Sequence, residues 1–325
     1  GFNLKWNMGW MNDLCHYVKL DPYFRQFNHK DITFSFLYAF SENYVLPLSH
    51  DEVVHMKGSL LNKMPGSDGE KFAGVRVFYT YMLTHPGKKL LMMGSEFGQW
   101  NEWHFEYSLD WHLMDNEINR KTQAFFKAAN HLYLEHPALW QEDFSWEGFE
   151  WIYADDNQAN TISFIRKDDK GDFLVAVCNF SPVDRTGYCI GVPVPGAYTC
   201  IFNTDDEDFG GQGRGDKEPV KSTYTPCHGR EQSIIITLPP MSAVIYKCTR
   251  KFPPRRKKEA KLAVKAPAAK PALRKAGEKP AVKEKAGKPA LRKASAKPAV
   301  KEKSLHPAVR TKAQHPAVKK SPKEG

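Results

Sequence analysis

The fold of this chain is decided by residues 44–52, which read Tyr44-Val45-Leu46-Pro47-Leu48-Ser49-His50-Asp51-Glu52. Residues 44–48, the apolar part of this stretch, are typical of a short buried strand, and His50, Asp51 and Glu52 follow where that strand ends. In a barrel of alternating strands and helices, side chains at the C-terminal ends of the strands face the active site. A histidine and two carboxylates there can bind sugar hydroxyls and stabilise a cationic sugar transition state. The alternative is a solvated turn that opens a helix with acidic residues.

The sequence around this stretch predicts strands and helices in alternation over residues 1–147. A second strand is predicted at residues 88–94, and it again leads to a polar group, Glu96. Between the two strands, apolar residues recur at the spacing of a helix, at Phe72, Val75, Phe78, Tyr79, Met82 and Leu83. A later helix is predicted to close before Pro137, with Phe125, Phe126, Ala129, Leu132 and Tyr133 on its apolar side. Strand, helix and strand form the unit from which parallel sheets and barrels are built.

Residues 148–249 show a different pattern, of short strands separated by turn residues. The predicted strands are rich in Ile, Val, Phe, Tyr and Thr, and they cover residues 150–153, 161–166, 173–180, 197–203, 233–238 and 244–246. Clusters of Asp, Gly, Asn and Pro lie between them. This pattern predicts an antiparallel β-sandwich domain.

Residues 250–325 form a third region, which we predict to be a disordered basic tail. It carries 25 of the 47 Lys and Arg residues but 5 of the 37 Asp and Glu residues, a balance of +20, whereas residues 1–249 have a balance of −10. Lys-Pro-Ala or His-Pro-Ala recurs every nine residues in six copies, from Lys270 to His315. No copy holds enough apolar surface to offset the entropy of ordering it. The tail could bind polyanions through its lysines, or be an extension that adds only solubility.

Composition excludes several other classes of function. The six cysteines form no C-x-x-C pair and no His/Cys cluster with zinc spacing, so we expect free thiols, no metal site and no cofactor. No signal peptide and no apolar run near 18 residues is present. We therefore expect a cytoplasmic protein without a membrane span.

Several motifs in the first 145 residues resemble those of the glycogen branching enzymes (1,4-α-glucan branching enzymes), a family of the α-amylase superfamily. His50-Asp51 by itself indicates only that superfamily. Two segments point to branching enzymes in particular, namely Lys5-Trp6-Asn7-Met8-Gly9-Trp10 and Ser108-Leu109-Asp110-Trp111. Other matching segments are residues 48–55, 63–66, 85–91, 93–99 and 102–103. Residues 148–248 resemble the C-terminal β-domain of the same family, and the tail lies outside the resemblance.

The resemblance implies the C-terminal part of a (β/α)8 barrel over residues 1–147, followed by a β-domain over residues 148–249. It also implies transfer of an α-1,4-glucan segment to a 6-hydroxyl group, with retention of configuration at the reacting carbon. Asp51 matches the carboxylate that stabilises the transition state, and His50 matches its hydroxyl-binding neighbour. Glu96, Trp100 and Trp103 follow a strand end and are candidate glucan contacts, although a surface carboxylate and core aromatics are the alternative.

The sequence departs from the family in ways that limit this expectation. The nucleophilic Asp and the acid/base Glu of the family lie on earlier strands, which these 325 residues do not contain, and a retaining mechanism needs both. Asp13, Glu42, Glu96 and Asp110 do not lie in the corresponding motifs. We therefore expect an inactive C-terminal fragment. A non-catalytic glucan-binding remnant and a polyanion-associated protein remain as alternatives.

Two smaller departures flank the loop that follows His50-Asp51. Met56 occupies a position where the family has glycine, and residues 67–70 differ from the usual segment. Because the acceptor glucan would approach this loop, both departures concern the preferred chain length more than the class of reaction.

Overall fold

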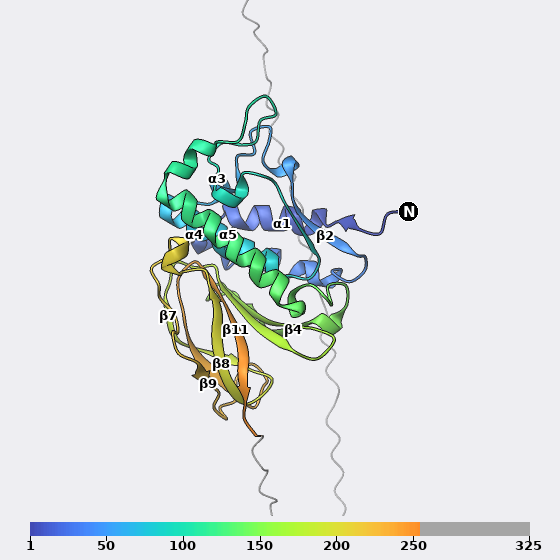
Figure 1. Ribbon diagram of the computed structural model, residues 1–325. Helices are drawn as coiled ribbons and strands as arrows, with labels where there is room; N and C mark the ends of the chain where they lie inside the picture. The colour runs from blue at the N-terminus through green and yellow to red at the C-terminus, as the bar shows by residue number, and fades with distance from the viewer. Residues whose placement is uncertain (254–325) are drawn as a thin grey trace, which may run out of the picture. The chain divides into compact units, whose positions relative to one another are not determined.

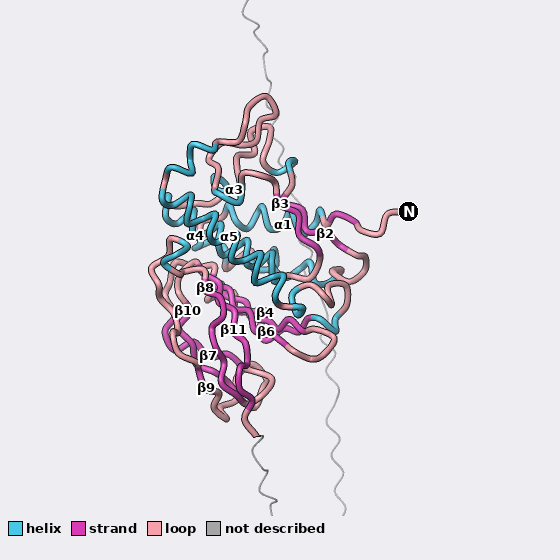
Figure 2. Tube along the Cα trace, in the orientation of Figure 1, coloured by secondary structure: helices cyan, strands magenta, loops and turns pink. Residues whose placement is uncertain are grey.

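The computed structural model describes residues 1–253 of the chain, which form one compact unit with two regions. Residues 1–148 carry the parallel strands and the long helices, and residues 149–253 carry an antiparallel β-sandwich (Figures 1 and 2). The disordered tail was predicted to begin at residue 250, but Arg250 and Lys251 belong to the last strand of the sandwich, which corrects that boundary. The rest of the predicted tail, with its repeats and its polyanion-binding role, lies outside the described residues from residue 254 onward.

The first region contains a three-stranded parallel sheet in the order β1-β2-β3, formed by β1 (Lys5–Trp6), β2 (Tyr44–Leu48) and β3 (Lys88–Leu91). Trp6 pairs with Val45, and Leu48 pairs with Leu91. The two strands predicted from the sequence are therefore confirmed as parallel neighbours. That they are the last strands of a (β/α)8 barrel remains a prediction.

Five α-helices accompany this sheet: α1 (Met8–Lys19), α2 (Pro22–Arg25), α3 (Leu60–Lys63), α4 (Asp68–Thr84) and α5 (Glu117–Glu135). The helices predicted around Phe78 and Phe126 correspond to α4 and α5. Ser67 and Glu70 start α4 as a capping box, in which the Glu70 carboxylate accepts the backbone N–H of Ser67 at 2.7 Å. Seven 3-10 helices lie in the connections of this region: η1 (His29–Ile32), η2 (Phe34–Leu37), η3 (His50–Glu52), η4 (Ser95–Phe97), η5 (Trp111–Asp115), η6 (Pro137–Leu139) and η7 (Trp146–Gly148).

The second region is a sandwich of a six-stranded sheet, β4-β5-β6-β11-β8-β9, and a two-stranded sheet, β10-β7. The strands are β4 (Phe149–Asp156), β5 (Thr161–Lys167), β6 (Phe173–Asn179), β7 (Arg185–Gly191), β8 (Gly196–Asn203), β9 (Val220–Lys221), β10 (Ser233–Leu238) and β11 (Ser242–Lys251), and η8 (Glu207–Phe209) follows β8. The six strands predicted from the sequence are all present, whereas β7 and β9 were not predicted. The predicted antiparallel sandwich is confirmed.

Both faces of the large sheet are buried, which explains why β5 and β6 are apolar without alternation. Ile165, Val175 and Val177 point into the sandwich, where they pack with the apolar residues of β7 and β10. Their neighbours Phe164 and Ala176 point to the opposite face, because successive side chains of a strand alternate. Helix α4 packs against β6 and β11 on that face, so one core extends from the parallel sheet to the sandwich.

Two fully buried arginines join the two regions. The Arg25 guanidinium donates hydrogen bonds to the carbonyls of Phe180 and Val18, at 2.8 and 3.2 Å. The Arg166 guanidinium forms a 2.8 Å ion pair with Asp143 and donates to the carbonyl of Thr84. Since these bonds cross between the regions in a buried environment, they hold the sandwich in one position against the helices.

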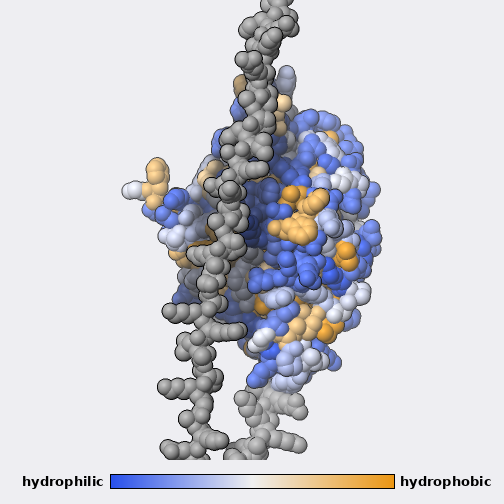
Figure 3. Space-filling model, turned by 180° about the vertical axis from the view of Figure 1, so that it is seen from behind, coloured by the Kyte–Doolittle hydropathy of each residue, from blue (hydrophilic) through white to orange (hydrophobic). Residues whose placement is uncertain are grey.

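The surface carries apolar patches within a largely hydrophilic face (Figure 3). Large apolar side chains that are exposed include Phe2, Tyr23, Phe24, Phe27, Leu37, Met56 and Phe105. Within residues 1–253, no helix combines the length and the apolar character that crossing a membrane requires.

Candidate functional site

The candidate site lies at the edge of the parallel sheet where β2 and β3 end. The two strands are in register up to their last residues, and the backbone N–H of Met92 donates to the Leu48 carbonyl at 2.8 Å. The chain after β2 and the chain after β3 therefore leave the sheet side by side. This edge is the one at which barrels of parallel strands place their active sites.

His50 and Asp51 lie in η3, directly after β2, as the sequence predicted. Nε2 of His50 is 3.1 Å from Oδ1 of Asp51, and the two side chains are 53% and 48% exposed. Glu52 differs from both, because its side chain is only 11% exposed and pairs with Lys57 at 3.3 Å. Of the three polar residues that follow the strand, only His50 and Asp51 are open to a ligand. The one-turn 3-10 helix decides this difference.

Beneath η3, Glu52 belongs to a buried polar group that supports the loop. The Lys63 ammonium group is buried and donates to the carbonyls of Lys57 and Gly58, at 2.7 and 3.2 Å. Burial lowers the pKa of Lys63. Burial, followed by the nearby Glu52 carboxylate, raises the pKa of the Cys15 thiol to about 12, so this thiol stays protonated and is a packing residue.

Glu102 joins the loop after β3 to the loop after β2. Its two carboxylate oxygens accept the backbone N–H groups of Met56 and Gly58, each at 3.0 Å. These two hydrogen bonds lower the pKa of Glu102. The N–H of the next residue, Trp103, donates to the Val53 carbonyl at 2.8 Å. This role of Glu102 was not predicted from the sequence, although the residue lies in one of the family motifs.

The loop that Glu102 holds contains two consecutive residues in the left-handed region of backbone space, His55 at φ 53° and Met56 at φ 68°. Residues with a Cβ atom are disfavoured there, and glycine is not. Because Met56 occupies the position where glycine is expected, the backbone there is strained. The Met56 side chain lies beside the site, and 96% of its surface is exposed.

The remaining predicted site residues follow β3. Glu96 lies in η4 and is partly exposed. Trp103 lines a shallow depression of about 10 Å³ together with Val53 and Met93. Trp100 is partly buried, with its ring 6.0 Å from that of Phe72. Trp100 thus packs against Phe72 with part of its surface exposed, and Glu96, Trp100 and Trp103 remain candidate glucan contacts.

Asp110 has a local role that the sequence did not reveal. Its carboxylate accepts a hydrogen bond from the Asn101 amide at 2.8 Å, and its backbone N–H donates to the Gln99 side chain at 3.1 Å. Asp110 thus fixes the turn that carries Trp100 and Trp103.

The comparisons with known proteins first define the class of fold. Residues 151–249 match the family described as the alpha amylase C-terminal all-beta domain. The solved structure of alpha-amylase from H. orenii has a TM-score of 0.51 at 16% identity, over 76% of this chain and 49% of that chain. The structure of AmyP in complex with maltose has a TM-score of 0.54 at 12% identity, over 77% of this chain and 50% of that chain. The sandwich therefore matches the alpha amylase C-terminal all-beta domain, and the chain shares its fold with about half of each of these two structures.

Sequence relatives then define the family. The 1,4-alpha-glucan branching enzyme of Cellvibrio japonicus is 48% identical over 247 residues, which are 76% of this chain and 33% of that protein. The branching enzyme of Aquifex aeolicus is 50% identical over 248 residues, which are 76% of this chain and 39% of that protein. The resemblance predicted from the motifs is confirmed, and the chain is homologous to the branching enzymes. It spans about a third of the length of these curated relatives.

Proposed function

We propose that this chain supplies part of the active site of a 1,4-alpha-glucan branching enzyme, with Asp51 as the group that stabilises the transition state and His50 as a hydroxyl-binding neighbour. One observation carries this proposal. Asp51 and His50 lie together at the carboxyl end of β2, 3.1 Å apart and half exposed, while Glu52 turns inward. The high identity to branching enzymes supports the same assignment.

In the proposed reaction, an α-1,4 bond of the donor glucan is broken and the cut segment is held as a covalent glycosyl intermediate. A 6-hydroxyl group of an acceptor glucose then takes the segment, and the α configuration is retained. The sugar ring gains positive charge in both transition states. A hydrogen bond from the ring hydroxyl beside the reacting carbon to the Asp51 carboxylate strengthens as that charge develops, so it lowers the barrier more than it improves binding.

The 325 residues by themselves are expected to be inactive. Glu42 precedes β2 and pairs with Lys5, so it lies at the opposite end of the strand from Asp51. Asp13 lies within α1, and the Asp110 carboxylate is bonded to Asn101. None of these carboxylates is placed as a nucleophile or as an acid/base beside Asp51. We also propose that the donor and acceptor chains are α-glucans and that Glu96, Trp100 and Trp103 contact them. The alternative for the tail is that it binds polyanions.

A chimera tests the role of Asp51. Residues 1–249 would replace the matching third of the Aquifex aeolicus branching enzyme, which supplies the remaining residues of the barrel. The chimera with Asp51 is expected to branch amylose. Asp51→Asn should lower kcat by more than about tenfold, a barrier difference of about 1.4 kcal/mol, with a smaller change in KM.

The control variant is Asp115→Asn, because Asp115 is an exposed aspartate that lies in η5. It should keep the activity of the chimera. If Asp51→Asn retained more than about a tenth of kcat while the chimera remained folded by circular dichroism, the assignment would be wrong. The 325-residue polypeptide, assayed by loss of iodine colour from amylose, should match a heat-inactivated sample.

A further inference from the structure

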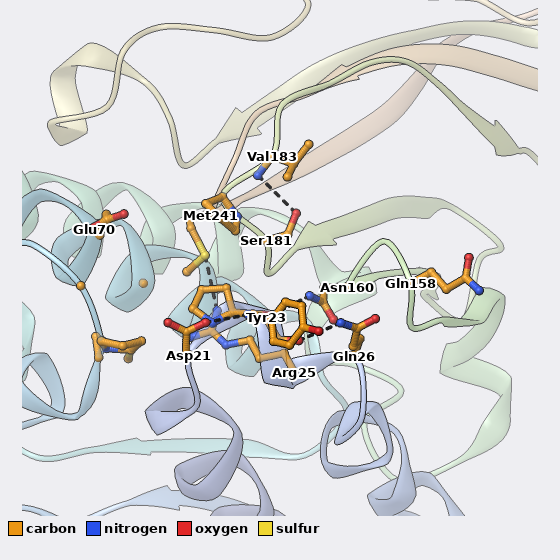
Figure 4. Close-up of a pocket in the computed structure, with 16 residues that line it drawn as sticks. Asp21, Tyr23, Arg25, Gln26, Glu70, Gln158, Asn160, Ser181, Val183 and Met241 are labelled. Carbon is orange, nitrogen blue, oxygen red and sulfur yellow. Dashed lines mark hydrogen bonds between the residues drawn. The ribbon is translucent and has the colours of Figure 1, made fainter.

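A second cavity lies at the junction between the helices and the sandwich, away from His50 and Asp51. Its volume is about 430 Å³, and neither His50 nor Asp51 lines it. Its walls come from α2, from the residues before and within α4, and from the sandwich loops near residues 158–160 and 181–183 (Figure 4). Such junctions are common places for ligand sites.

Buried hydrogen bonds between the two regions hold this cavity open. The Asn160 side-chain amide donates to the Pro22 carbonyl at 2.9 Å, and Arg25 donates to the Phe180 carbonyl at 2.8 Å. Arg25 also contacts the Met241 sulfur at 3.4 Å, beside the cavity (Figure 4). Because these contacts fix the walls relative to one another, binding requires little reorganisation of the walls.

The lining combines an exposed aromatic ring with apolar side chains. The Tyr23 side chain is 65% exposed, and Met64, Val183 and Met241 complete an apolar surface. A tyrosine ring of this kind offers a flat apolar face with a polar tip. It fits a ligand that has a flat apolar face of its own.

The polar part of the lining consists mostly of hydrogen-bond acceptors. Among residues 1–253, one oxygen each of Asp21 and Glu70 and the side-chain carbonyls of Gln26 and Gln158 accept no hydrogen bond from another protein group, so they are available to a ligand. Asn160 Oδ1 is buried without a partner within the same residues. A ligand rich in hydroxyl donors would satisfy such acceptors.

The charges of the lining favour a neutral ligand. Asp21 and Glu70 disfavour a phosphate or a carboxylate, and the buried Arg25 cation, which bonds to carbonyls and to a sulfur, offsets one of their two negative charges. A pyranose ring meets these requirements, because it is neutral and has hydroxyl groups at its edge and a flat apolar face.

We propose that this cavity, which we call the junction site, is a second α-glucan-binding site in which a glucose unit of a malto-oligosaccharide packs on Tyr23 and donates hydroxyl hydrogen bonds to Gln26 and Gln158. The choice of α-glucan among sugars rests on the proposed function, whereas the sugar class rests on the lining. The site holds a glucan chain and performs no chemistry on it.

The test uses the complete 325-residue protein and maltotriose as the probe, with affinity measured by calorimetry or by NMR titration. Tyr23→Ser should weaken binding about tenfold, and Val183→Trp, which fills the cavity from its rim, should weaken it by a similar factor. The matched control is Phe34→Ser, which removes an aromatic ring that is 50% exposed outside the junction site and should change affinity less than about twofold.

Asp51→Asn separates this proposal from the proposed function. It should leave the junction-site affinity for maltotriose unchanged. If neither Tyr23→Ser nor Val183→Trp weakens maltotriose binding, glucan binds elsewhere and the junction site is wrong, while the proposed function, which the chimera tests by kcat, stands. Absence of maltotriose binding, or equal affinity for the β-linked cellotriose, would also overturn the α-glucan assignment.

Discussion

The carboxylate of Glu102 accepts the backbone N–H of Met56 at 3.0 Å, although 46 residues separate the two positions. Its second oxygen accepts the N–H of Gly58, so one side chain fixes the loop that follows His50 and Asp51. The bond is made at a residue whose φ of 68° disfavours any side chain. The loop beside the candidate site is therefore held in a strained conformation by a contact from the neighbouring strand end.

Met56→Gly should stabilise the protein by about 1 kcal/mol, because removing the Cβ atom relieves the left-handed strain by more than the added freedom of glycine costs. Met56→Ala is the matched control, since it removes the exposed side chain but keeps the Cβ atom, and it should give no gain. Urea unfolding of the three proteins measures the difference. Equal midpoints for the glycine and alanine variants would show that the loop stores no strain at this position.

Asp143→Asn should destabilise the protein by about 3 kcal/mol, because it leaves the fully buried Arg166 cation without its counterion. The control variant is Glu117→Gln, which removes an exposed ion pair with Lys121 at 2.8 Å and should cost less than about 1 kcal/mol. Chemical unfolding measures both. A similar cost for the two variants would mean that the buried pair does not hold the sandwich against the helices.

Stability should decrease below pH 6.5 because of His85. Burial, with the nearby Lys89 and Arg166 cations, lowers the pKa of His85 from 6.5 to about 3. Nδ1 lies 2.7 Å from the Pro86 carbonyl and Nε2 lies 3.1 Å from the Ser35 hydroxyl, so the neutral ring donates to the first and accepts from the second. Between these two pKa values the unfolded chain binds a proton that the folded protein does not bind, which lowers stability by up to about 1.4 kcal/mol per pH unit.

His85→Gln should reduce this slope, and replacement of the exposed His131 by glutamine should not. Unfolding free energies measured from pH 7 to pH 4 compare the three proteins. If the His85 variant keeps the slope of the wild type, the acid sensitivity comes from other groups.

The basic residues of the tail should bind polyanions through charge alone. Affinity for duplex DNA should decrease steeply with salt, because each lysine–phosphate contact releases counterions. Deletion of residues 254–325 should abolish binding, because the remaining residues are acidic in balance. A salt titration of the complete and the shortened chains tests this. Binding that resists salt, or that the shortened chain retains, would contradict a charge-driven tail.

Sequence reasoning identified elements where the pattern of apolar residues is strong. The strands β2, β5, β6 and β11 and the helices α4 and α5 are buried on one side or more, so their apolar residues stand out in the sequence as continuous runs or at helical spacing. Strand β7 was missed because several of its residues are exposed or only partly buried, and β9 has only two residues. Hydrophobic periodicity carries little information for such strands.

For the candidate site, the sequence by itself determined that His50 and Asp51 follow a buried strand, since strand length and the change from apolar to polar residues are local properties. The tertiary structure alone decided that Glu52 turns inward and that Glu102 holds the loop at Met56. The burial of Glu52 depends on the packing of η3 near Cys15 and Lys63. The contact of Glu102 depends on the parallel pairing of β2 with β3, which brings two distant loops to one edge of the sheet. The junction site depends in the same way on the packing of the sandwich against α2 and α4, because its walls are contributed by segments more than 100 residues apart in the sequence.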